Sequence, residues 1–252
     1  MLNIVIPMAG RGSRFVNAGY VLPKPLIPVH GVPMIRLVIE NLRPSCDHRF
    51  IFICQRAHVA EHDLHGQLSR WTSGCALIEL DGITEGAACT VLTARDLINS
   101  DDPLMIANSD QYVDAAIDPY LDFMATSRLD GLIMTMQAND PKWSFAGLNQ
   151  NGLVERVVEK EPISTHATVG IYNFRRGRDY VRAADAMIAK DLRVNNEFYV
   201  APVYNEVIAE GARIGIYDIG AEGDGMYGLG IPPDLDAFLA LPLSKRATAG
   251  LR

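Results

Sequence analysis

Short apolar segments alternate with longer segments of helical periodicity in the first half of the chain. Strands are predicted where apolar residues run together, at residues 4–6, 50–54, 76–80 and 104–107. Helices are predicted where apolar residues recur at helical spacing, at residues 34–42, 57–68 and 85–98. This alternation is typical of a parallel, doubly wound α/β sheet, which binds ligands beyond the carboxyl ends of its strands. The predicted ligand site is therefore the rim that holds the loop around Gly10, residues 81–86 and Asp110.

Shorter connections in the second half predict a mixed part of the sheet. Strands are predicted at residues 132–137, 145–148, 154–159, 168–174 and 214–219. The run Asn149-Gln150-Asn151-Gly152 is a hairpin-turn signal between two of them. Helices are predicted at residues 178–189, 199–210 and 232–239, the last opened by two prolines. The tail from Ser244 is predicted to be loose.

Composition narrows the class of protein. With 252 residues, 48% hydrophobic and 21% charged, the chain fits one large α/β domain. It has no apolar run of about 18 residues and no amino-terminal signal pattern, so we expect neither a membrane span nor a secreted protein. The net charge of −7 without a basic run makes nucleic acid an improbable partner. The four cysteines lack C-x-x-C spacing, which favours buried free thiols in a reducing cytoplasm over zinc ligands.

A glycine-rich loop follows the first predicted strand. It reads Gly10-Arg11-Gly12-Ser13-Arg14, and Pro23-Lys24-Pro25 follows shortly after. Glycines let a ligand approach main-chain N–H groups, which together form a concavity for anions. Arg14 and Lys24 add fixed positive charge, so the stretch predicts a polyphosphate site. The dinucleotide fingerprint is excluded by Phe15, and the P-loop pattern is absent. On spacing alone, a strand–helix turn with two solvated basic residues is the alternative.

These residues also carry a family resemblance. The run from Gly10 to Phe15, followed by Pro23-Lys24-Pro25-Leu26, resembles the signature of nucleotidylyltransferases that make activated sugars, including their cytidylyltransferase relatives. The resemblance extends with gaps to about Phe238. It implies a Rossmann-like, GT-A-like sheet that is mostly parallel and flanked by helices. It also implies a single domain, with a nucleotide-binding half at residues 1–115, an acceptor-binding half at 116–240 and a loose tail at 241–252.

The resemblance assigns roles around the triphosphate. It implies that Ala9, Gly10, Gly12 and Ser13 wrap a nucleoside triphosphate whose phosphates contact Arg14 and Lys24, both expected to be catalytic. Asp110 follows a buried strand, where a carboxylate can hold Mg²⁺ against phosphate oxygens. Within Ser109-Asp110-Gln111 it matches the family's Asp that binds the catalytic Mg²⁺, and Asp114 is a weaker candidate. A strand-end Asp that caps a turn is the alternative.

The segment from Asp81 to Thr90 resembles the family's base-binding segment, and Gly86 matches a glycine whose backbone reads the base. Thymidylyl- and uridylyltransferases often carry Gln where this chain has Asp81. An ionised Asp only accepts hydrogen bonds. Cytosine offers an amino group to it, whereas uracil and thymine offer one N–H between two acceptors. Asp81 therefore favours CTP, with GTP second.

The acceptor is expected in the second half. Glu159-Lys160-Glu161-Pro162 resembles a motif whose Lys holds the acceptor phosphate, so Lys160 is also expected to be catalytic and Glu159 to contact polar groups. On charge alone this run would be a solvated face. Gly170 matches a glycine of the acceptor pocket, and Glu197 falls where the family has a sugar-contacting Glu.

One departure from the family pattern concerns the metal. Gly228 stands where many members carry a second metal-binding Asp, and glycine has no side chain to ligate. Either one Mg²⁺ on Asp110 suffices, or a neighbour such as Asp224 reaches in, or the chain is an inactive regulatory relative. For His58, His62 and His65, a solvated helix face is favoured over a metal site.

The sequence thus predicts a nucleotidylyltransferase that moves a nucleoside monophosphate, CMP above others, from an NTP to a phosphorylated sugar, polyol or similar acceptor and releases pyrophosphate. Synthesis of surface polysaccharide or capsule precursors in the cytoplasm is the expected setting. A homo-oligomer is compatible with the sequence. The alternatives are a GT-A glycosyltransferase that uses an NDP-sugar and a non-catalytic nucleotide-binding regulatory protein.

Overall fold

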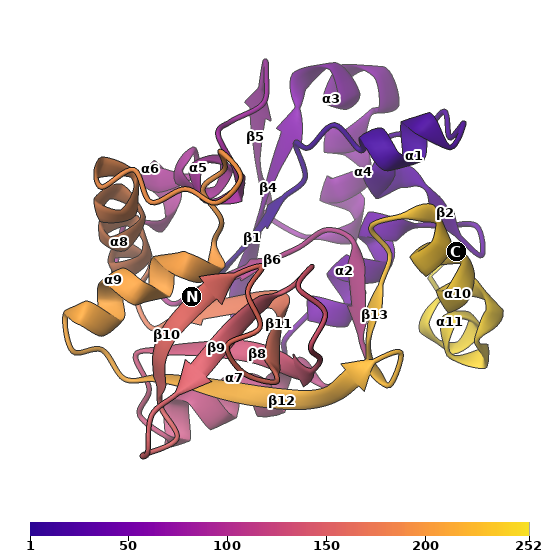
Figure 1. Cartoon of the computed structure of the whole chain (residues 1–252). Coiled ribbons are helices and arrows are strands. Elements are labelled where there is room, and N and C mark those ends of the chain that lie inside the picture. Colours follow the sequence, from indigo (N-terminus) through magenta and orange to yellow (C-terminus); the bar gives the residue numbers. More distant parts are fainter. Residues whose placement is uncertain (252) are drawn as a thin grey trace.

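A central sheet organises the molecule, and a computed structural model describes it over residues 1–251 (Figure 1). Four neighbouring strands come from the first half of the chain: β5 (Ala76–Leu80), β4 (His48–Gln55), β1 (Leu2–Pro7) and β6 (Leu104–Ala107). They are parallel, so their carboxyl ends lie at one edge of the sheet. There β1 leads into the Gly10 loop and β6 leads into the segment with Asp110. The predicted parallel part of the sheet is confirmed.

The second half extends this sheet to eleven strands of mixed direction, as predicted. β11 (His166–Phe174) is antiparallel to β6 and to β8 (Gly131–Gln137), which is parallel to β12 (Ile214–Glu222). The far edge consists of β13 (Gly225–Gly228) and β7 (Gln111–Val113). The predicted hairpin is present as β9 (Ser144–Leu148) and β10 (Val154–Glu159). A separate two-stranded sheet consists of β2 (Pro28–Val29) and β3 (Val32–Pro33).

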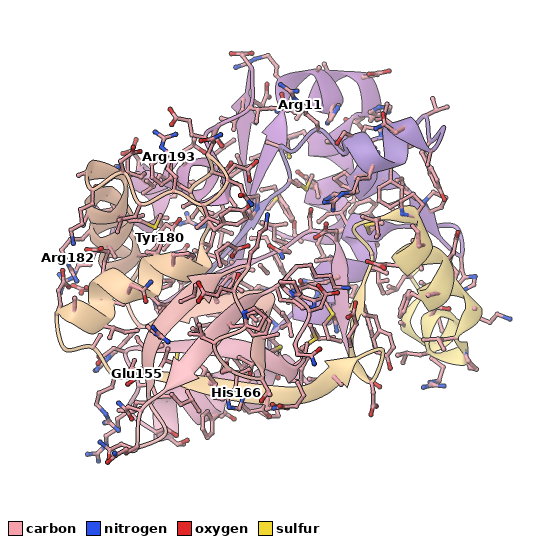
Figure 2. All side chains as sticks on the ribbon, in the orientation of Figure 1. Arg11, Glu155, His166, Tyr180, Arg182 and Arg193 are labelled. Carbon is pink, nitrogen blue, oxygen red and sulfur yellow. The ribbon has the colours of Figure 1, made fainter. Side chains whose placement is uncertain are left out.

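Helices cover both faces of the sheet. One face carries α2 (Met34–Leu42), α4 (Leu64–Trp71) and α7 (Ile117–Thr126), and the other carries α5 (Ala87–Leu92), α6 (Arg95–Ile98), α8 (Gly177–Ala189) and α9 (Tyr204–Ala209). Strand β1 is buried on both sides, because Ile4 packs in the first core and Val5 in the second. Each such side chain stabilises the fold by roughly 1.5–3 kcal/mol. On α8, the buried Tyr180 donates to the carbonyl of Ala88 on α5 (3.1 Å; Figure 2).

A third apolar cluster holds the Gly10 loop against the end of the chain. It joins α1 (Ser13–Asn17) and α2 to α10 (Pro232–Ala240) and α11 (Pro242–Ala247). Phe15 of α1 is buried there with Leu235 and Phe238 of α10, so it anchors the loop in the core. The prediction of a loose tail from Ser244 is wrong over α11. Ser244 is fully buried, and its hydroxyl forms a 2.8 Å hydrogen bond with Nε2 of His30.

Three predicted helices are interrupted. The helix expected at 57–68 is two helices, α3 (Arg56–His62) and α4, because Asp63 adopts a left-handed conformation (φ 46°) and caps α4 by accepting from the N–H of Gly66. The helix expected at 85–98 divides into α5 and α6. The helix expected at 199–210 begins with a 3-10 turn at Ala201–Val203 and continues as α9. Helix α7 was not predicted.

The structure also bears on the expectations for the cysteines, the histidines and membrane-spanning helices. All four cysteines are free, but only Cys54 is buried, and Cys46 is exposed, contrary to the prediction. Burial raises the pKa of the Cys54 thiol to about 12, which keeps it protonated at neutral pH. Within residues 1–251, no group of three His, Cys, Asp or Glu side chains is arranged to hold a metal ion, so the histidines of α3 and α4 form no such site. None of the helices described is long and apolar enough to cross a membrane.

Candidate active site

The Gly10 loop and Lys24 fit closely together. Gly12 lies at the amino end of α1 in a left-handed conformation (φ 59°), which glycine adopts without strain. A Cβ atom on Gly12 would lie 3.4 Å from Cβ of Lys24, which begins a 3-10 turn at Lys24–Leu26. The loop therefore holds Lys24 over the carboxyl end of β1. Ser13 and Arg14, in the first turn of α1, are exposed to solvent.

A cavity of about 310 Å³ opens between this loop and the neighbouring strand ends. Its lining combines the sequence-predicted nucleotide residues with one predicted acceptor residue: Ala9, Gly10, Lys24, Gly86, Asp110 and Glu197. Gly12, Ser13 and Arg14 lie outside this lining. The cavity is on the predicted rim of the sheet, so the expectation from the alternation of strands and helices agrees with the structure.

Lys24 and Asp110 form an ion pair inside this cavity. Nζ of Lys24 lies 2.7 Å from Oδ2 of Asp110, and the two side chains are 24% and 23% exposed. The main-chain carbonyl of Asp110 accepts from the N–H of Leu229 (2.8 Å), which fixes the residue against β13. A cation and a carboxylate that face one cavity can serve a triphosphate and its metal ion together.

Main-chain contact between distant segments shapes the side of the cavity that Gly86 lines. Gly86 has φ 127°, and a Cβ there would lie 2.4 Å from the carbonyl oxygen of Phe198. Phe198 donates its N–H to the carbonyl of Glu85 (2.8 Å) and accepts from the N–H of Ala88 (3.0 Å). Only glycine fits this close approach. The same contact brings Glu197 to the nucleotide cavity, whereas the sequence predicted it for the acceptor.

Asp81 is turned away from the nucleotide cavity. Its side chain is 78% exposed and pairs with Arg56 at 2.6 Å, and this hydrogen bond and charge hold the pKa of Asp81 below its usual value. The hydroxyls of Thr84 and Thr90 face the cavity instead, hydrogen-bonded to each other at 2.5 Å. A role of Asp81 in reading the base stays a prediction, and it would require the Arg56 pair to open.

A second cavity, of about 280 Å³, adjoins the first. The two share Asn108 and Ala87 in their linings. The second is lined mainly by the second half of the chain: Lys142, Trp143, Ser144, Glu159, Thr168, Val169, Gly170, Tyr172, Tyr199, Val200 and Ala201. The predicted acceptor residues Glu159 and Gly170 are thus brought together next to the nucleotide cavity.

Hydrogen bonds hold the polar side chains at the second cavity in fixed orientations. The buried carboxylate of Glu159 accepts from the Ser144 hydroxyl, and burial raises its pKa although that hydrogen bond opposes the rise. Lys160 has φ 60°, and its ammonium donates to the Tyr199 hydroxyl at 3.0 Å, which raises the pKa of Lys160. Lys160 is exposed beside the cavity and reaches it through Tyr199.

One buried donor of this lining, Nε1 of Trp143, has no hydrogen-bond partner within residues 1–251. Nε2 of Gln111 is a second unpaired buried donor, but Gln111 lines neither cavity. The side chain of Gln111 packs closely against Gly170. A Cβ on Gly170 would lie 2.7 Å from Oε1 of Gln111 and 2.1 Å from Nδ2 of Asn108. Unpaired buried donors are costly unless a ligand satisfies them.

Asp234 was missed by the sequence reasoning. It lies in the first turn of α10, and its Oδ2 is 3.1 Å from the position that a Cβ on Gly228 would take. Likewise, a Cβ on Gly230 would lie 2.6 Å from Oδ2 of Asp110. The two glycines therefore leave space for two carboxylates. Asp224, the neighbour considered from the sequence, lies in the β12–β13 turn and lines neither cavity.

The surroundings of Asp234 link it to the rest of the site. Partial burial raises its pKa, and the carboxylates of Glu222 and Asp110 add to the rise, whereas Lys142 and Arg14 oppose it. Asp110 lines the first cavity, and Asp234, which lines neither cavity, is near enough for the two charges to interact. Two carboxylates suit Mg²⁺, which takes its remaining ligands from water and phosphate. The residues present fit that ion.

Comparison with known proteins identifies the architecture. Residues 4–197 match the family model described as nucleotidyl transferase. The chain is 24% identical over 179 residues to the bifunctional protein GlmU of Methanocaldococcus jannaschii, covering 69% of this chain and 40% of that protein. It therefore spans well under half the length of the curated relatives that it matches.

Solved structures with the same fold extend the comparison. A nucleoside-diphosphate-sugar pyrophosphorylase from Vibrio cholerae RC9 has 26% identity and a TM-score of 0.80, over 94% of this chain and all of that one. An inositol-1-phosphate CTP transferase from T. maritima has 12% identity and a TM-score of 0.73 over 99% and 97%. A UDP-glucose pyrophosphorylase from Acinetobacter baumanii has 15% identity and a TM-score of 0.71 over 94% and 92%.

Proposed function

The chain belongs to the nucleotidyl transferase family, and from that premise we propose that it transfers a nucleoside monophosphate from an NTP to a phosphorylated small molecule and releases pyrophosphate. The observation that carries the proposal is the Lys24–Asp110 ion pair in one of two adjoining cavities. An enzyme of this kind must bind a triphosphate and an acceptor phosphate side by side. The shared residues Asn108 and Ala87 mark where the reacting groups would meet.

The nucleotide side would be held by the Gly10 loop. Main-chain N–H groups from Ala9 to Ser13 would surround the phosphates, and Lys24 would neutralise their charge. Arg14 is exposed on α1 and would add a second cation once a triphosphate is present. This reaction depends on positioning and charge neutralisation more than on covalent catalysis. Nucleotidyl transfer needs no nucleophilic side chain from the protein, whether carboxylate, thiol or hydroxyl.

The acceptor would occupy the second cavity. Lys160 would hold the acceptor phosphate beside Tyr199, and Glu159 would accept hydrogen bonds from the acceptor's hydroxyl groups. Because Gly170 has no side chain, Asn108 would have space to contact both substrates. One acceptor phosphate oxygen would attack the α-phosphorus in line, and the bond to the leaving pyrophosphate would break. Sugar and polyol phosphates are the proposed acceptor class.

Mg²⁺ would be held by Asp110, with Asp234 as the second carboxylate. Bound there, the ion would offset the negative charge of the triphosphate and of the leaving pyrophosphate. Asp234 takes the space that a side chain at Gly228 would fill. This chain would therefore supply its second acid from the first turn of α10, so the glycine at 228 does not require an inactive protein.

CTP is the proposed nucleotide, with GTP second. Support comes from Asp81, and one neighbour of the fold is a CTP transferase. Another neighbour is a UDP-glucose pyrophosphorylase, so the structural neighbours differ in nucleobase and the choice of CTP depends on Asp81. Cytoplasmic synthesis of surface polysaccharide or capsule precursors is the proposed setting, for which the free thiols and the family are the support.

Two other functions remain as alternatives. A glycosyltransferase would use Asp110 with an NDP-sugar, but a diphosphate donor needs no cations for a third phosphate. A regulatory protein would bind NTP without turnover. Asp234 argues against the second alternative, because it lies where it would supply the missing acid.

A pyrophosphate-release assay with Mg²⁺ tests the proposal. It would combine CTP, GTP, UTP, dTTP and ATP with a panel of phosphorylated sugars, polyols and amides. Release with CTP alone is expected. Release with UTP or dTTP would keep the transferase and refute the Asp81 argument. Release of free NDP from an NDP-sugar would favour the glycosyltransferase, and NTP binding without turnover across the panel would favour the regulatory protein.

A further inference from the structure

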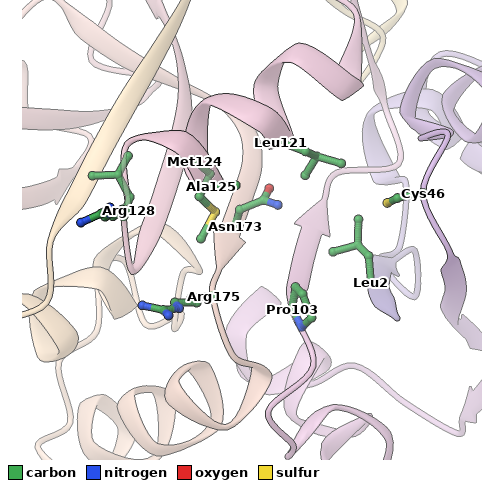
Figure 3. A pocket seen from close by; sticks show the side chains of 10 residues that line it. Leu2, Cys46, Pro103, Leu121, Met124, Ala125, Arg128, Asn173 and Arg175 are labelled. Atoms are coloured by element: carbon green, nitrogen blue, oxygen red, sulfur yellow. The ribbon is translucent and has the colours of Figure 1, made fainter.

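A cavity of about 540 Å³ lies at the end of the sheet opposite the candidate active site (Figure 3). Leu2 begins β1 and Pro103 precedes β6, so the cavity touches the amino ends of the strands whose carboxyl ends carry the Gly10 loop and Asp110. Helix α7 covers it with Leu121, Met124 and Ala125. The proposed transferase reaction uses no residue of this lining.

Most of the lining is aliphatic. Its apolar members are Leu2, Pro103, Leu121, Met124, Ala125 and Leu129. The volume is within the range of about 300–1,000 Å³ that is usual for small-molecule sites. Such sites combine apolar walls with a few placed polar groups. An apolar ring system or short hydrocarbon body would fit these walls.

Asn173 supplies a polar group in the middle of the apolar walls. It is 2% exposed, on the β11 face that also contacts α7, and its main-chain carbonyl accepts from the Tyr204 hydroxyl. Its side-chain Oδ1 has no hydrogen-bond partner within residues 1–251. Figure 3 shows the carboxamide between the two ends of the cavity. This oxygen is itself shielded from solvent, so a molecule in the cavity would not reach it in the conformation described, and Asn173 only makes this part of the wall more polar.

Positive charge is concentrated at one end. Figure 3 shows Arg128 and Arg175 together at the end away from Leu2 and Cys46. The guanidinium of Arg128 makes no ion pair within residues 1–251. Arg175 has only a loose pair, 3.6 Å from Asp130, and its side chain is largely exposed. A guanidinium is suited to carboxylate, phosphate or sulfonate groups.

We propose that this cavity is a second ligand site, which binds an amphiphilic anion. The apolar body of the ligand lies against α7 and the strand ends, and its anionic group lies between Arg128 and Arg175. The apolar walls and the two arginines meet in one cavity. The site is independent of the proposed transferase activity.

The probe for this site is 8-anilinonaphthalene-1-sulfonate, which joins aromatic rings, an N–H donor and a sulfonate. Equilibrium dialysis with the full chain should give one bound probe per chain. Saturating CTP with Mg²⁺ should not displace it. N-phenyl-1-naphthylamine has the same rings without the sulfonate, and it should bind more weakly.

Variants then locate the probe. Ala125→Trp fills the cavity from α7 and should abolish binding, whereas Thr126→Trp, on the same helix outside the lining, should leave it unchanged. The double variant Arg128→Gln/Arg175→Gln should raise the Kd of the sulfonate probe about fivefold to tenfold, since exposed ion pairs are individually weak. It should not change the Kd of the uncharged analogue. Arg70→Gln, an exposed arginine on α4, is the matched charge control.

Several results would overturn the proposal. Binding that survives Ala125→Trp, or that CTP displaces, would mean that the probe lies elsewhere. Equal affinity for both probes in wild type would remove the anionic part of the argument. Absence of binding together with a dimer in sedimentation, broken by Ala125→Trp, would assign this face to an interface between copies of the chain. Circular dichroism of each variant separates these results from unfolding.

Discussion

Nζ of Lys24 lies 2.7 Å from Oδ2 of Asp110, although 86 positions separate the two residues in the chain. The glycine loop after β1 presents the cation, and the end of β6 presents the acid. At about a quarter exposed, the pair is only partly shielded from water, so each side chain can exchange its partner for a ligand at modest cost. A triphosphate would take Lys24, and a metal ion would take Asp110.

Lys24→Ala should therefore lower kcat/KM for pyrophosphate release by about 10²–10³-fold, the range found when a preorganised group that stabilises developing charge is removed. Lys245→Ala, in the exposed last turn of α11, is the control and should keep wild-type activity. The measurement is the pyrophosphate-release assay with matched circular dichroism spectra. Wild-type kinetics in Lys24→Ala would show that the triphosphate binds elsewhere.

Asp234→Asn should raise the Mg²⁺ concentration needed for half-maximal activity at least about tenfold, because one of two carboxylates at the ion loses its charge. Direct binding of Mn²⁺ to the protein with NTP, followed by electron paramagnetic resonance, should weaken in parallel. Asp236→Asn changes an exposed carboxylate on the same helix and should have no effect.

A rescue sharpens this test. In an Asp234→Ala background, Gly228→Asp places a carboxylate in the space that Asp234 leaves, and it should restore part of the metal affinity. Gly228→Asp alone crowds two carboxylates, since its Cβ would lie 3.1 Å from Oδ2 of Asp234, and it should not improve on wild type. Unchanged Mn²⁺ binding in Asp234→Asn would leave Asp110 as the single protein ligand.

Local patterns predicted the nucleotide side well. Apolar runs and helical spacing located α2, β5 and β6 with the observed bounds, and the rim of the sheet followed from their alternation. Asp110 was singled out because it stands shortly after the buried strand β6, which ends at Ala107, and because it matches the family's metal-binding Asp. These features depend on residues close in sequence, which is why the pattern alone reveals them.

Features that depend on tertiary packing were missed. Asp234 lies beside Gly228 because Leu235 and Phe238 pack α10 in one cluster with Phe15, a contact that no local pattern encodes. The direction of Asp81 is set by Arg56 at the start of α3, which motif matching ignores. The break at Asp63 depends on a left-handed conformation that helical periodicity does not reveal. Distant contacts decided the first two cases, and a local backbone conformation decided the third.

Gly170→Ala should destabilise the protein more than Gly152→Ala. Both glycines have left-handed φ values, 81° and 74°, so both variants incur strain of roughly 1–2 kcal/mol. At Gly152 nothing lies within 4 Å of the new Cβ, whereas at Gly170 it would meet Nδ2 of Asn108 at 2.1 Å. Urea unfolding gives the two losses of stability. Gly170→Ala should also raise KM for the acceptor phosphate, because Asn108 must move, and equal effects of the two variants would refute the close approach.

Glu159→Gln should make the protein more stable at neutral pH and less able to bind its acceptor. Burial raises the pKa of Glu159 in the folded protein above the usual 4.5. Between those two values the folded state holds more protons than the unfolded state, so this residue's contribution to stability falls as pH rises through the window. Glutamine has no charge to bury and resembles the protonated acid.

The difference in unfolding free energy between Glu159→Gln and wild type should therefore be near zero below pH 4.5, should grow in favour of the variant as pH rises from 4.5 to the raised pKa, and should level off above it. Urea unfolding from pH 4 to pH 8 measures it. KM for the acceptor should rise, while KM for the NTP should not, because Glu159 lines only the second cavity. Glu155→Gln, an exposed change on the same strand β10, should give a flat difference across this pH range. A flat difference for Glu159→Gln as well would mean that its carboxylate stays hydrated.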